Sequence, residues 1–232
     1  MTPRPLALIV GAGDGLSAAL ARRFSRDGEL SVVLASRHPE RLAGQAAELG
    51  ALALACDATD PAQVAALFDR VDRECPGRLE LVVYNAGLRV PGAIGELDPA
   101  AVADALAVNA YGGFLVAQQA ARRMLAHGRG TVLFTGASAS VKGYPRSAAF
   151  AMGKFALRGL AQSLARELAP QGVHVAHVVL DGQIAHPQRA RPETPDAQLD
   201  ADAIAAEYLR LAQQPRSAWT WEVELRPWVE RF

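Results

Sequence analysis

A lysine and a phenylalanine in the stretch AFAMGKFALRGL (149–160) are the first residues whose spacing could do chemistry. Lys154 follows Phe150 by four positions, and a helix would place both side chains on one face. A proton donor at the first position, beside the ammonium at the second, would make an acid suited to reducing a carbonyl. Phenylalanine has no proton to donate. The pair therefore indicates a catalytic helix that lost its acid, one that uses another acid, or an ordinary core helix.

Glycines near the start of the chain indicate a second candidate site, one that binds phosphate. The apolar run 6–10 leads directly into GAGDGLSAALARRF, with Gly11, Gly13 and Gly15 in the turn. Glycine lets the backbone turn tightly, and the N–H groups that open the following helix suit a pyrophosphate. A glycine-rich turn without a ligand is the alternative interpretation. No Gly-Lys-Ser/Thr follows, which excludes a Walker A loop.

The elements that must position these residues alternate along the chain. Apolar runs expected to be strands occupy 6–10, 31–35, 51–55, 79–85, 130–136 and 173–180, and a last strand-like run occupies 217–228. Amphipathic stretches expected to be helices occupy 15–27, 39–48, 61–75, 99–127, 147–169 and 201–214. Almost continuous apolar character is typical of parallel strands that are covered on both faces.

This alternation predicts one α/β domain over residues 1–232, with a Rossmann-like, doubly wound fold. We expect a parallel seven-stranded sheet with helices on both faces, built by right-handed crossovers. The polar segment 186–200 carries three prolines and interrupts the alternation, so we expect a loop or substrate lid there.

Composition and charge narrow the class of protein. The 232 residues include 24 Lys plus Arg and 24 Asp plus Glu, so the net charge favours neither nucleic acid nor an anionic membrane as a partner. Cys56 and Cys75 lie in no CxxC motif, so we predict no metal site and expect a reduced, cytoplasmic chain. The first apolar run is too short for a signal peptide, and no run reaches the roughly 18 apolar residues of a membrane span.

Several motifs together resemble those of the short-chain dehydrogenase/reductase family, over about residues 5 to 185. The turn fits the family's G-x-x-x-G-x-G spacing through Gly11 and Gly15, with Ser17 at the last glycine position. Leu16 stands where the commoner G-x-G-x-x-G would have its third glycine. The run YNAG (84–87) resembles the family's Asn-Asn-Ala-Gly, with Tyr84 in place of the first asparagine.

Further positions follow the same pattern. Asp57 in CDATD matches an aspartate near the adenine, and Asn109 in VNAYGGF matches the asparagine that helps to hold a proton-relay water. Lys154 falls at the position of the active-site lysine. The run LDGQIAH stands where the family has Pro-Gly-x-Val-x-Thr; it matches at Gly182 and Ile184 and departs at Asp181 and His186.

The resemblance implies a nicotinamide dinucleotide as cofactor. The second strand ends in LASRHPERL, with Ser36 where an acidic residue would bind the ribose of NAD, and Arg37 next. A guanidinium binds phosphate oxygens well, so this tip favours NADP(H) over NAD(H), although Arg37 as a mere surface residue is the alternative. Asp14 argues the other way, because related NADP-preferring proteins often have a basic residue there. The expected cofactor residues are Gly11, Gly13, Asp14, Gly15, Leu16, Ser36, Arg37, Asp57, Ala58, Asn85, Ala86, Gly87, Lys154, Gly182 and Ile184.

An unrelated class, the dinucleotide-like methyltransferases, also places glycines after the first strand. Those proteins usually show an acidic ribose-binding residue at the end of the second strand. Ser36, Arg37 and Lys154 argue against that class here.

The family's acid is the tyrosine of a Tyr-x-x-x-Lys pair, and a serine about 13 positions upstream positions the substrate oxygen. Here Phe150 occupies the tyrosine position, and counting back leads to Ala137, with Ser138 one place later. The predicted catalytic residues are therefore Lys154, Asn109 and Ser138.

Three interpretations of this helix stay open. In the first, the protein is an oxidoreductase that reduces a small carbonyl or activated alkene, and its proton comes from Ser138, Tyr111, Tyr144, His186 or a water held by Lys154 and Asn109. In the second, it binds NADP(H) without turnover, as a sensor or as a subunit of an active partner. In the third, Phe150 and Lys154 are structural, although a core-facing ammonium is costly without partners.

The resemblance also implies assembly and a small-molecule substrate. The family often dimerises through the long helices, here 99–127 and 147–169, so we expect a homodimer or homotetramer. Arg189 and Arg191 in the lid could meet an anionic substrate, although such arginines are more often simply solvated. Three tryptophans lie near the end of the sequence, at positions 219, 221 and 228. We expect Trp219, Trp221 and Trp228 to cover a sheet edge or a subunit contact. The sequence does not name the substrate.

Overall fold

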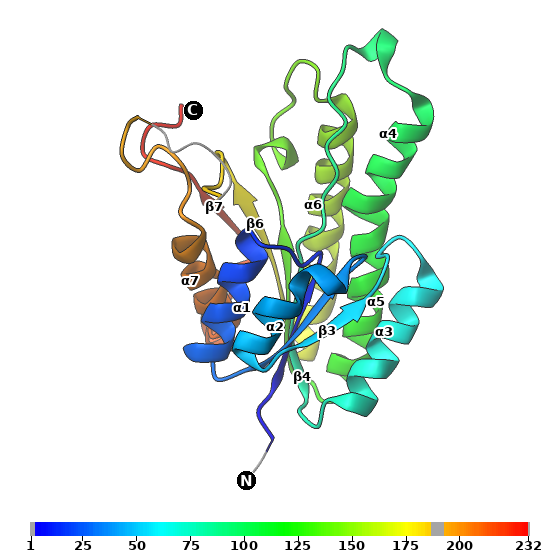
Figure 1. The fold of residues 1–232 in the computed structure, drawn as a ribbon, viewed down its shortest axis with the longest axis vertical. Helices are drawn as coiled ribbons and strands as arrows, with labels where there is room; N and C mark the ends of the chain where they lie inside the picture. Colours follow the sequence, from blue (N-terminus) through cyan, green and yellow to red (C-terminus); the bar gives the residue numbers. More distant parts are fainter. Residues whose placement is uncertain (1–2, 187–192, 232) are drawn as a thin grey trace.

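The computed structural model describes residues 3–186 and 193–231 and contains a seven-stranded parallel sheet in the order β3-β2-β1-β4-β5-β6-β7 (Figure 1). The strands are β1 (Leu6–Val10), β2 (Ser31–Ser36), β3 (Leu52–Ala55), β4 (Leu79–Tyr84), β5 (Gly130–Thr135), β6 (Val173–Leu180) and β7 (Glu222–Leu225). The predicted doubly wound fold is confirmed. The strand order reverses between β1 and β4, which is where open α/β sheets bind ligands.

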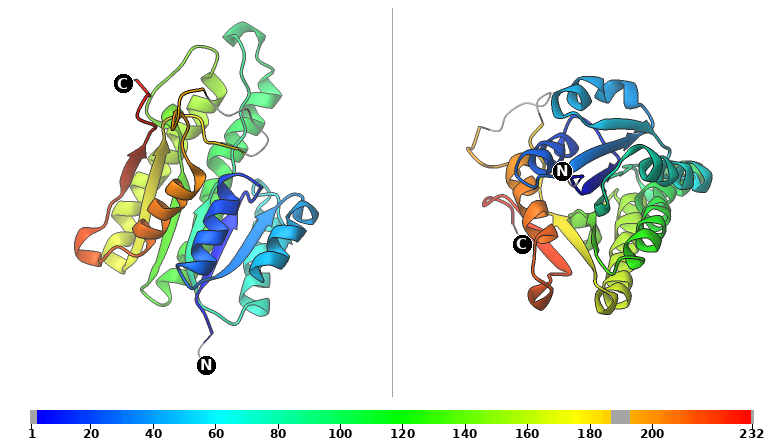
Figure 2. Two further views of the ribbon diagram at one scale, coloured as in Figure 1. Left: turned by 60° about the vertical axis from the view of Figure 1, so that its left-hand side comes forward. Right: turned by 90° about the horizontal axis from the view of Figure 1, so that it is seen from below.

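Helices cover both faces of the sheet (Figure 2). One layer contains α1 (Leu16–Arg26), α2 (Ala43–Leu49) and α7 (Ala201–Ala212), and the other contains α3 (Pro61–Glu74), α4 (Pro99–Leu106), α5 (Gly112–Leu125) and α6 (Ala148–Leu168). Successive residues of a strand face opposite sides, so in β1 Leu8 joins the core beneath α3, α5 and α6, while Ile9 joins the core beneath α1 and α7. Both faces of the strand are therefore buried, which explains its unbroken apolar run.

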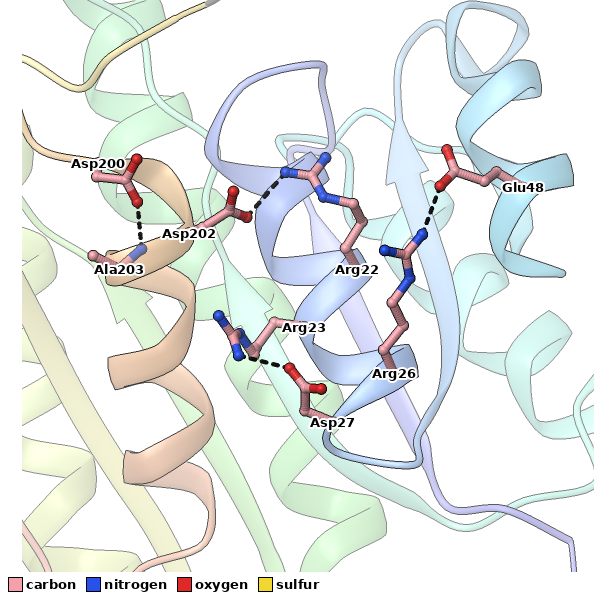
Figure 3. Close-up of polar contacts among 8 residues, drawn as sticks. All are labelled: Arg22, Arg23, Arg26, Asp27, Glu48, Asp200, Asp202 and Ala203. Carbon is pink, nitrogen blue, oxygen red and sulfur yellow. Dashed lines mark hydrogen bonds and ion pairs between the residues drawn. The ribbon is translucent and has the colours of Figure 1, made fainter.

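The helix α7 lies beside α1, and Figure 3 shows the polar contacts around this pair. Asp200 caps α7 because its carboxylate accepts a hydrogen bond from the amide of Ala203 at 2.7 Å. Arg22 of α1 reaches Asp202 in the first turn of α7 at 3.0 Å. Such exposed ion pairs contribute only about 0–1 kcal/mol, so the buried contact between the two helices holds them together.

The predicted lid is tied at both ends. Ile184 and Leu199 form an isolated parallel bridge, supported by a hydrogen bond from the amide of Ala185 to the carbonyl of Leu199 at 2.8 Å. Arg189 and Arg191 lie outside the described residues. The three tryptophans do not gather in one place: Trp219 stacks on His174 of β6, Trp221 lies beside Arg158 of α6, and the indole of Trp228 donates to the carbonyl of Pro195.

The long apolar helix expected at 99–127 runs from Pro99 to Leu125 and is interrupted by a π-helical turn, Ala107–Tyr111. Among the described residues, this 27-residue helix alone is long and apolar enough to cross a membrane by length and composition. Here α5 packs against the sheet and buries Leu115, Val116 and Ala120, as the core helix of an α/β domain does.

Candidate active site

A cavity of about 690 Å³ lies at the carboxyl ends of β1 to β4, where the strand order reverses. Cofactor and substrate sites commonly have volumes of about 300–1,000 Å³. Predicted cofactor residues on its wall are Gly11, Gly13, Asp14, Ser36, Arg37, Asp57, Ala58, Asn85, Ala86 and Gly87. Residues on the wall that the sequence analysis did not identify are Val10, Ala12, His38, Arg41, Leu42, Cys56, Thr59 and Val108.

The turn after β1 leaves its backbone open to a ligand. Gly11 has a φ of +84°, and a Cβ there would lie 2.4 Å from the backbone nitrogen of Ala86, so only glycine fits where the two loops cross. A Cβ at Gly13 would meet nothing within 4 Å, so this part of the wall has free space in front of it. Gly15 provides no side-chain cap for α1, and the N–H groups of the first turn remain suited to a pyrophosphate.

Ser17 joins this turn to the loop after β4. Its hydroxyl donates to the carbonyl of Gly11 at 3.1 Å, and the amide of Asn85 donates to the Ser17 hydroxyl at 2.8 Å. Leu16 is buried in the core beneath α1 and is absent from the cavity wall. Ser17, at the family's last glycine position, therefore has a structural role, because it connects the glycine turn to the loop after β4.

The end of the cavity next to β2 is basic. Arg37 and Arg41 both line it, and neither guanidinium forms an ion pair with a carboxylate within residues 3–186 and 193–231. His38 pairs with Glu40 at 3.3 Å. Arg41 lies beyond the strand tip that predicted Arg37, and its spacing of four residues from Arg37 is the signal in the sequence that could have found it. Two guanidinium groups here suit a phosphate better than a bare ribose.

A π-helical turn carries Asn109 into the site. In this turn the amide of Gly112 bonds to the carbonyl of Ala107, five residues back, which leaves the carbonyl of Val108 for another donor. The Tyr84 hydroxyl supplies that donor at 2.5 Å. A Cβ on Gly112 would lie 2.4 Å from the Tyr84 hydroxyl oxygen, so the tyrosine at the family's asparagine position requires this glycine. Burial, with a smaller contribution from Asp57, raises the pKa of Tyr84, so its hydroxyl stays a donor.

The side-chain amide of Asn109 makes two hydrogen bonds to one neighbour, Leu88. Its Nδ2 donates to the carbonyl of Leu88 at 2.7 Å, and its Oδ1 accepts from the amide of Leu88 at 3.1 Å. Asn109 is completely buried, and a Cβ on Gly153 of α6 would lie 2.6 Å from its Cβ. The predicted role of Asn109 in holding a water stays a prediction, and the observed role of its amide is to fix the loop after β4.

Lys154 lies on α6 and is only 4% exposed. Its Nζ donates to the carbonyl of Thr135 at 2.8 Å, and it pairs with no carboxylate among the residues that the structure describes. Burial lowers the pKa of Lys154 from its ordinary 10.5 to about 8. Phe150 is 7% exposed, with its ring centroid 5.8 Å from the Lys154 Nζ, so the two predicted neighbours do share one face. A Cβ on Gly87 would lie 3.8 Å from the same Nζ, which connects the lysine to the end of the cavity.

The other predicted proton donors lie in different places. Ser138 begins a 3₁₀ turn (Ser138–Ser140) packed against α6, and it is partly exposed, whereas Ser140 is buried and accepts from the amide of Ala137. Tyr111 stacks on Phe114 at an exposed face of the helix. The remaining two are Tyr144, which is exposed, and His186, whose Nε2 lies 3.3 Å from Asp14 at the glycine turn.

The residues after β6 form the last predicted part of the site. Gly182 has a φ of +151°, and a Cβ there would lie 2.7 Å from Pro227, so contacts within the protein explain this glycine. Asp181, at the family's proline position, is buried and pairs with Lys142 at 2.9 Å. Gly182 and Ile184 lie outside the wall of the cavity, and their contact with a cofactor stays a prediction.

Comparisons with known proteins agree with this geometry. Residues 5–190 match the family model described as short chain dehydrogenase. Human 17-beta-hydroxysteroid dehydrogenase type 1 is 36% identical over 75% of this chain, which spans 55% of that longer protein. Among solved structures, a short-chain dehydrogenase from Rhodopseudomonas palustris is 35% identical, with a TM-score of 0.84, and the match covers 97% of this chain and 99% of that one.

A third similar protein carries a nucleotide. A metagenomic short-chain oxidoreductase in complex with NADP is 29% identical, with a TM-score of 0.82, and the match covers 96% of this chain and 97% of that one. The matched family model covers most of the sequence, including the glycine turn, the YNAG motif and Lys154. The chain belongs to the short-chain dehydrogenase family.

Proposed function

We propose that this protein is an NADP(H)-dependent oxidoreductase that reduces a small carbonyl or activated alkene without a tyrosine at the acid position. The observation that carries this proposal is the form of the cavity. It runs from Arg37 and Arg41, which pair with no carboxylate among the described residues, past the glycine turn to Gly87, beside the buried Lys154. The similar oxidoreductase in complex with NADP supports the choice of cofactor.

The residues of this chain fit such a cofactor. When bound, NADPH supplies a hydride. The first turn of α1 and the open space at Gly13 suit its pyrophosphate, and Arg37 and Arg41 suit its 2′-phosphate. Lys154 has no carboxylate partner among the described residues, so its remaining N–H donors are available to ribose hydroxyls.

Lys154 is also the best candidate for the source of the proton. An acid works best when its pKa is near the working pH, and burial brings the pKa of Lys154 to about 8. Phe150 leaves no hydroxyl between this ammonium and the substrate, so a water must carry the proton. In this proposal Ser138 holds the substrate oxygen, and its partial exposure on the turn against α6 supports that role.

A second function, an NADP(H)-binding sensor or subunit without turnover, is favoured by one observation. Phe150 has no proton to donate, so the position at which the family has its acid supplies none here. Tight NADPH binding without reduction of any ketone or enone would favour this function over the first.

We also propose a homodimer or homotetramer built through α5 and α6. Exposed apolar side chains gather on this helical layer, which is unusual for a free surface. They are Tyr111, Phe114, Met152 and Phe155. A second copy of the chain would cover them, as the resemblance to the family implies.

The basic end of the cavity gives the first prediction. Arg37→Ala and Arg41→Ala should each weaken NADPH binding by about 10- to 100-fold, because each removes a charge-assisted hydrogen bond to phosphate. Calorimetric titration with NADPH and NADH measures this. NADH affinity should stay within about twofold, and Arg73→Ala, at the exposed far end of α3, should change neither affinity. Equal losses for both nucleotides would contradict a 2′-phosphate site.

Restoring the acid gives the second prediction. Phe150→Tyr should raise kcat for ketone reduction by about 10²- to 10⁴-fold, the usual contribution of a positioned general acid. Lys154 lies on the same face and would lower the pKa of the new tyrosine. Steady-state kinetics with NADPH measures the gain, and Phe155→Tyr on the exposed face of the same helix is the control. An unchanged kcat would show that the proton transfer is not limited by the missing hydroxyl.

The buried lysine gives the third prediction, which concerns how the stability of the fold depends on pH. Between pH 8 and 10.5 the unfolded chain keeps the Lys154 proton while the folded protein releases it, so this group makes the free energy of unfolding rise with pH there. Lys154→Met removes the free-energy cost of burying a charged ammonium, so below pH 8 the variant should be more stable than the wild type by about 1–3 kcal/mol. Urea unfolding at pH 7 to 10 should show this gain shrinking as pH rises. If the variant were more stable by the same amount at every pH, the lowered pKa of Lys154 would be refuted.

Assembly gives the fourth prediction. Sedimentation equilibrium of the wild-type protein should give a mass of two or four chains. Phe155→Glu should shift it toward one chain, because the exposed apolar surface would then carry a charge that a partner must desolvate. A monomeric wild-type protein would rule out this assembly.

A further inference from the structure

Arg89 lies directly above the ring that replaces the family's acid. It follows β4 by five residues, is exposed, and places its guanidinium carbon 4.8 Å from the centroid of the Phe150 ring. Its position is set by its neighbour, because both backbone polar groups of Leu88 are bonded to Asn109. The arginine is therefore held at the site by the same contact that fixes the loop after β4.

Two cations face this ring without an acidic partner. The Nζ of Lys154 lies 5.8 Å from the ring centroid and donates to a carbonyl, and Arg89 forms no ion pair in the described part of the chain. Positive charge that the protein does not balance attracts an anion from outside.

The chemistry of the pair indicates which anion. An aromatic face holds a guanidinium but offers no lone pairs to its N–H donors, so these donors remain available to a ligand. A phenyl ring also lacks the hydroxyl that could have accepted one of them. Two parallel N–H groups of arginine match the two oxygens of a carboxylate.

We propose that Arg89 binds a carboxylate of the substrate, which makes the substrate class small oxo acids or unsaturated carboxylic acids. This assignment rests on the proposed oxidoreductase function. The carboxylate would bind at the N–H edge of the Arg89 guanidinium, next to Phe150. The carbonyl or alkene beside it would then point toward Lys154, whose Nζ lies 5.8 Å from the centroid of the same ring. In this proposal the phenyl ring of Phe150 supports the guanidinium of Arg89 without accepting any of its N–H groups.

A pair of isosteric probes tests this without turnover. Benzoate and benzamide have the same shape and differ in charge, and their binding to the NADP⁺-loaded protein is measured by calorimetry. Benzoate should bind at least tenfold more tightly than benzamide. Arg89→Gln should abolish the difference, and Arg89→Lys should keep part of it, because lysine retains the charge but loses the paired N–H groups. Arg166→Gln, in the exposed last turn of α6, should leave both affinities unchanged.

The outcomes separate this inference from the proposed function. NADPH affinity is measured on each variant, and the probes are repeated without nucleotide. Normal NADPH binding with equal affinities for benzoate and benzamide would overturn the carboxylate site and leave the oxidoreductase proposal standing. A tenfold loss of NADPH affinity in Arg89→Gln would also overturn it, because Arg89 would then serve the cofactor's phosphates. If the wild type binds no NADPH, the proposed function fails, and only benzoate binding that depends on Arg89 would still support the anion site.

Discussion

The paired hydrogen bonds between the amide of Asn109 and the backbone of Leu88 are the contact on which the rest of the site depends. They fix the loop after β4 at one point, with Gly87 on one side at the cofactor cavity and Arg89 on the other above Phe150. The Asn109 side chain is completely buried, so a local opening that broke both bonds would leave its amide without these partners in the core. One side chain thus fixes the backbone between Gly87 at the cavity and Arg89 at the Phe150 ring.

Asn109 is in turn held by a departure from regular helix. The π-helical turn gives up regular α-helical bonding, and the Tyr84 hydroxyl satisfies the carbonyl of Val108. Gly112 and Gly153 allow this arrangement, since a Cβ at either position would lie 2.4 or 2.6 Å from Tyr84 or Asn109 respectively. The π-turn, the two glycines and the tyrosine from β4 therefore form one packing unit, and a change in one would require changes in the others.

The sheet and its layers could be predicted because each strand is a buried apolar run and each helix an amphipathic one. The basic Arg37 and the glycine turn could also be predicted, because their chemistry depends on local sequence next to a strand end. The π-turn could not, since it depends on a hydroxyl that arrives from β4, more than twenty residues away. Arg89 was missed for the same reason: nothing in the sequence around it indicates that Asn109 would direct it over Phe150. At Gly182 the ligand contact that the family motif suggested stays a prediction, and the structure adds a packing reason for the glycine, because a Cβ there would lie 2.7 Å from Pro227.

The bridge between Ile184 and Leu199 has an evolutionary consequence. The bridge holds the two ends of the predicted lid segment together. Its strand-like pairing therefore offsets the entropy that is lost when the two ends are brought together. Lengthening such a closed loop adds a cost that grows only logarithmically with its length, about 0.6 kcal/mol for each doubling. Insertions and replacements between these two residues therefore add little to the cost of folding, and the sequence there can vary in length while the bridge is kept.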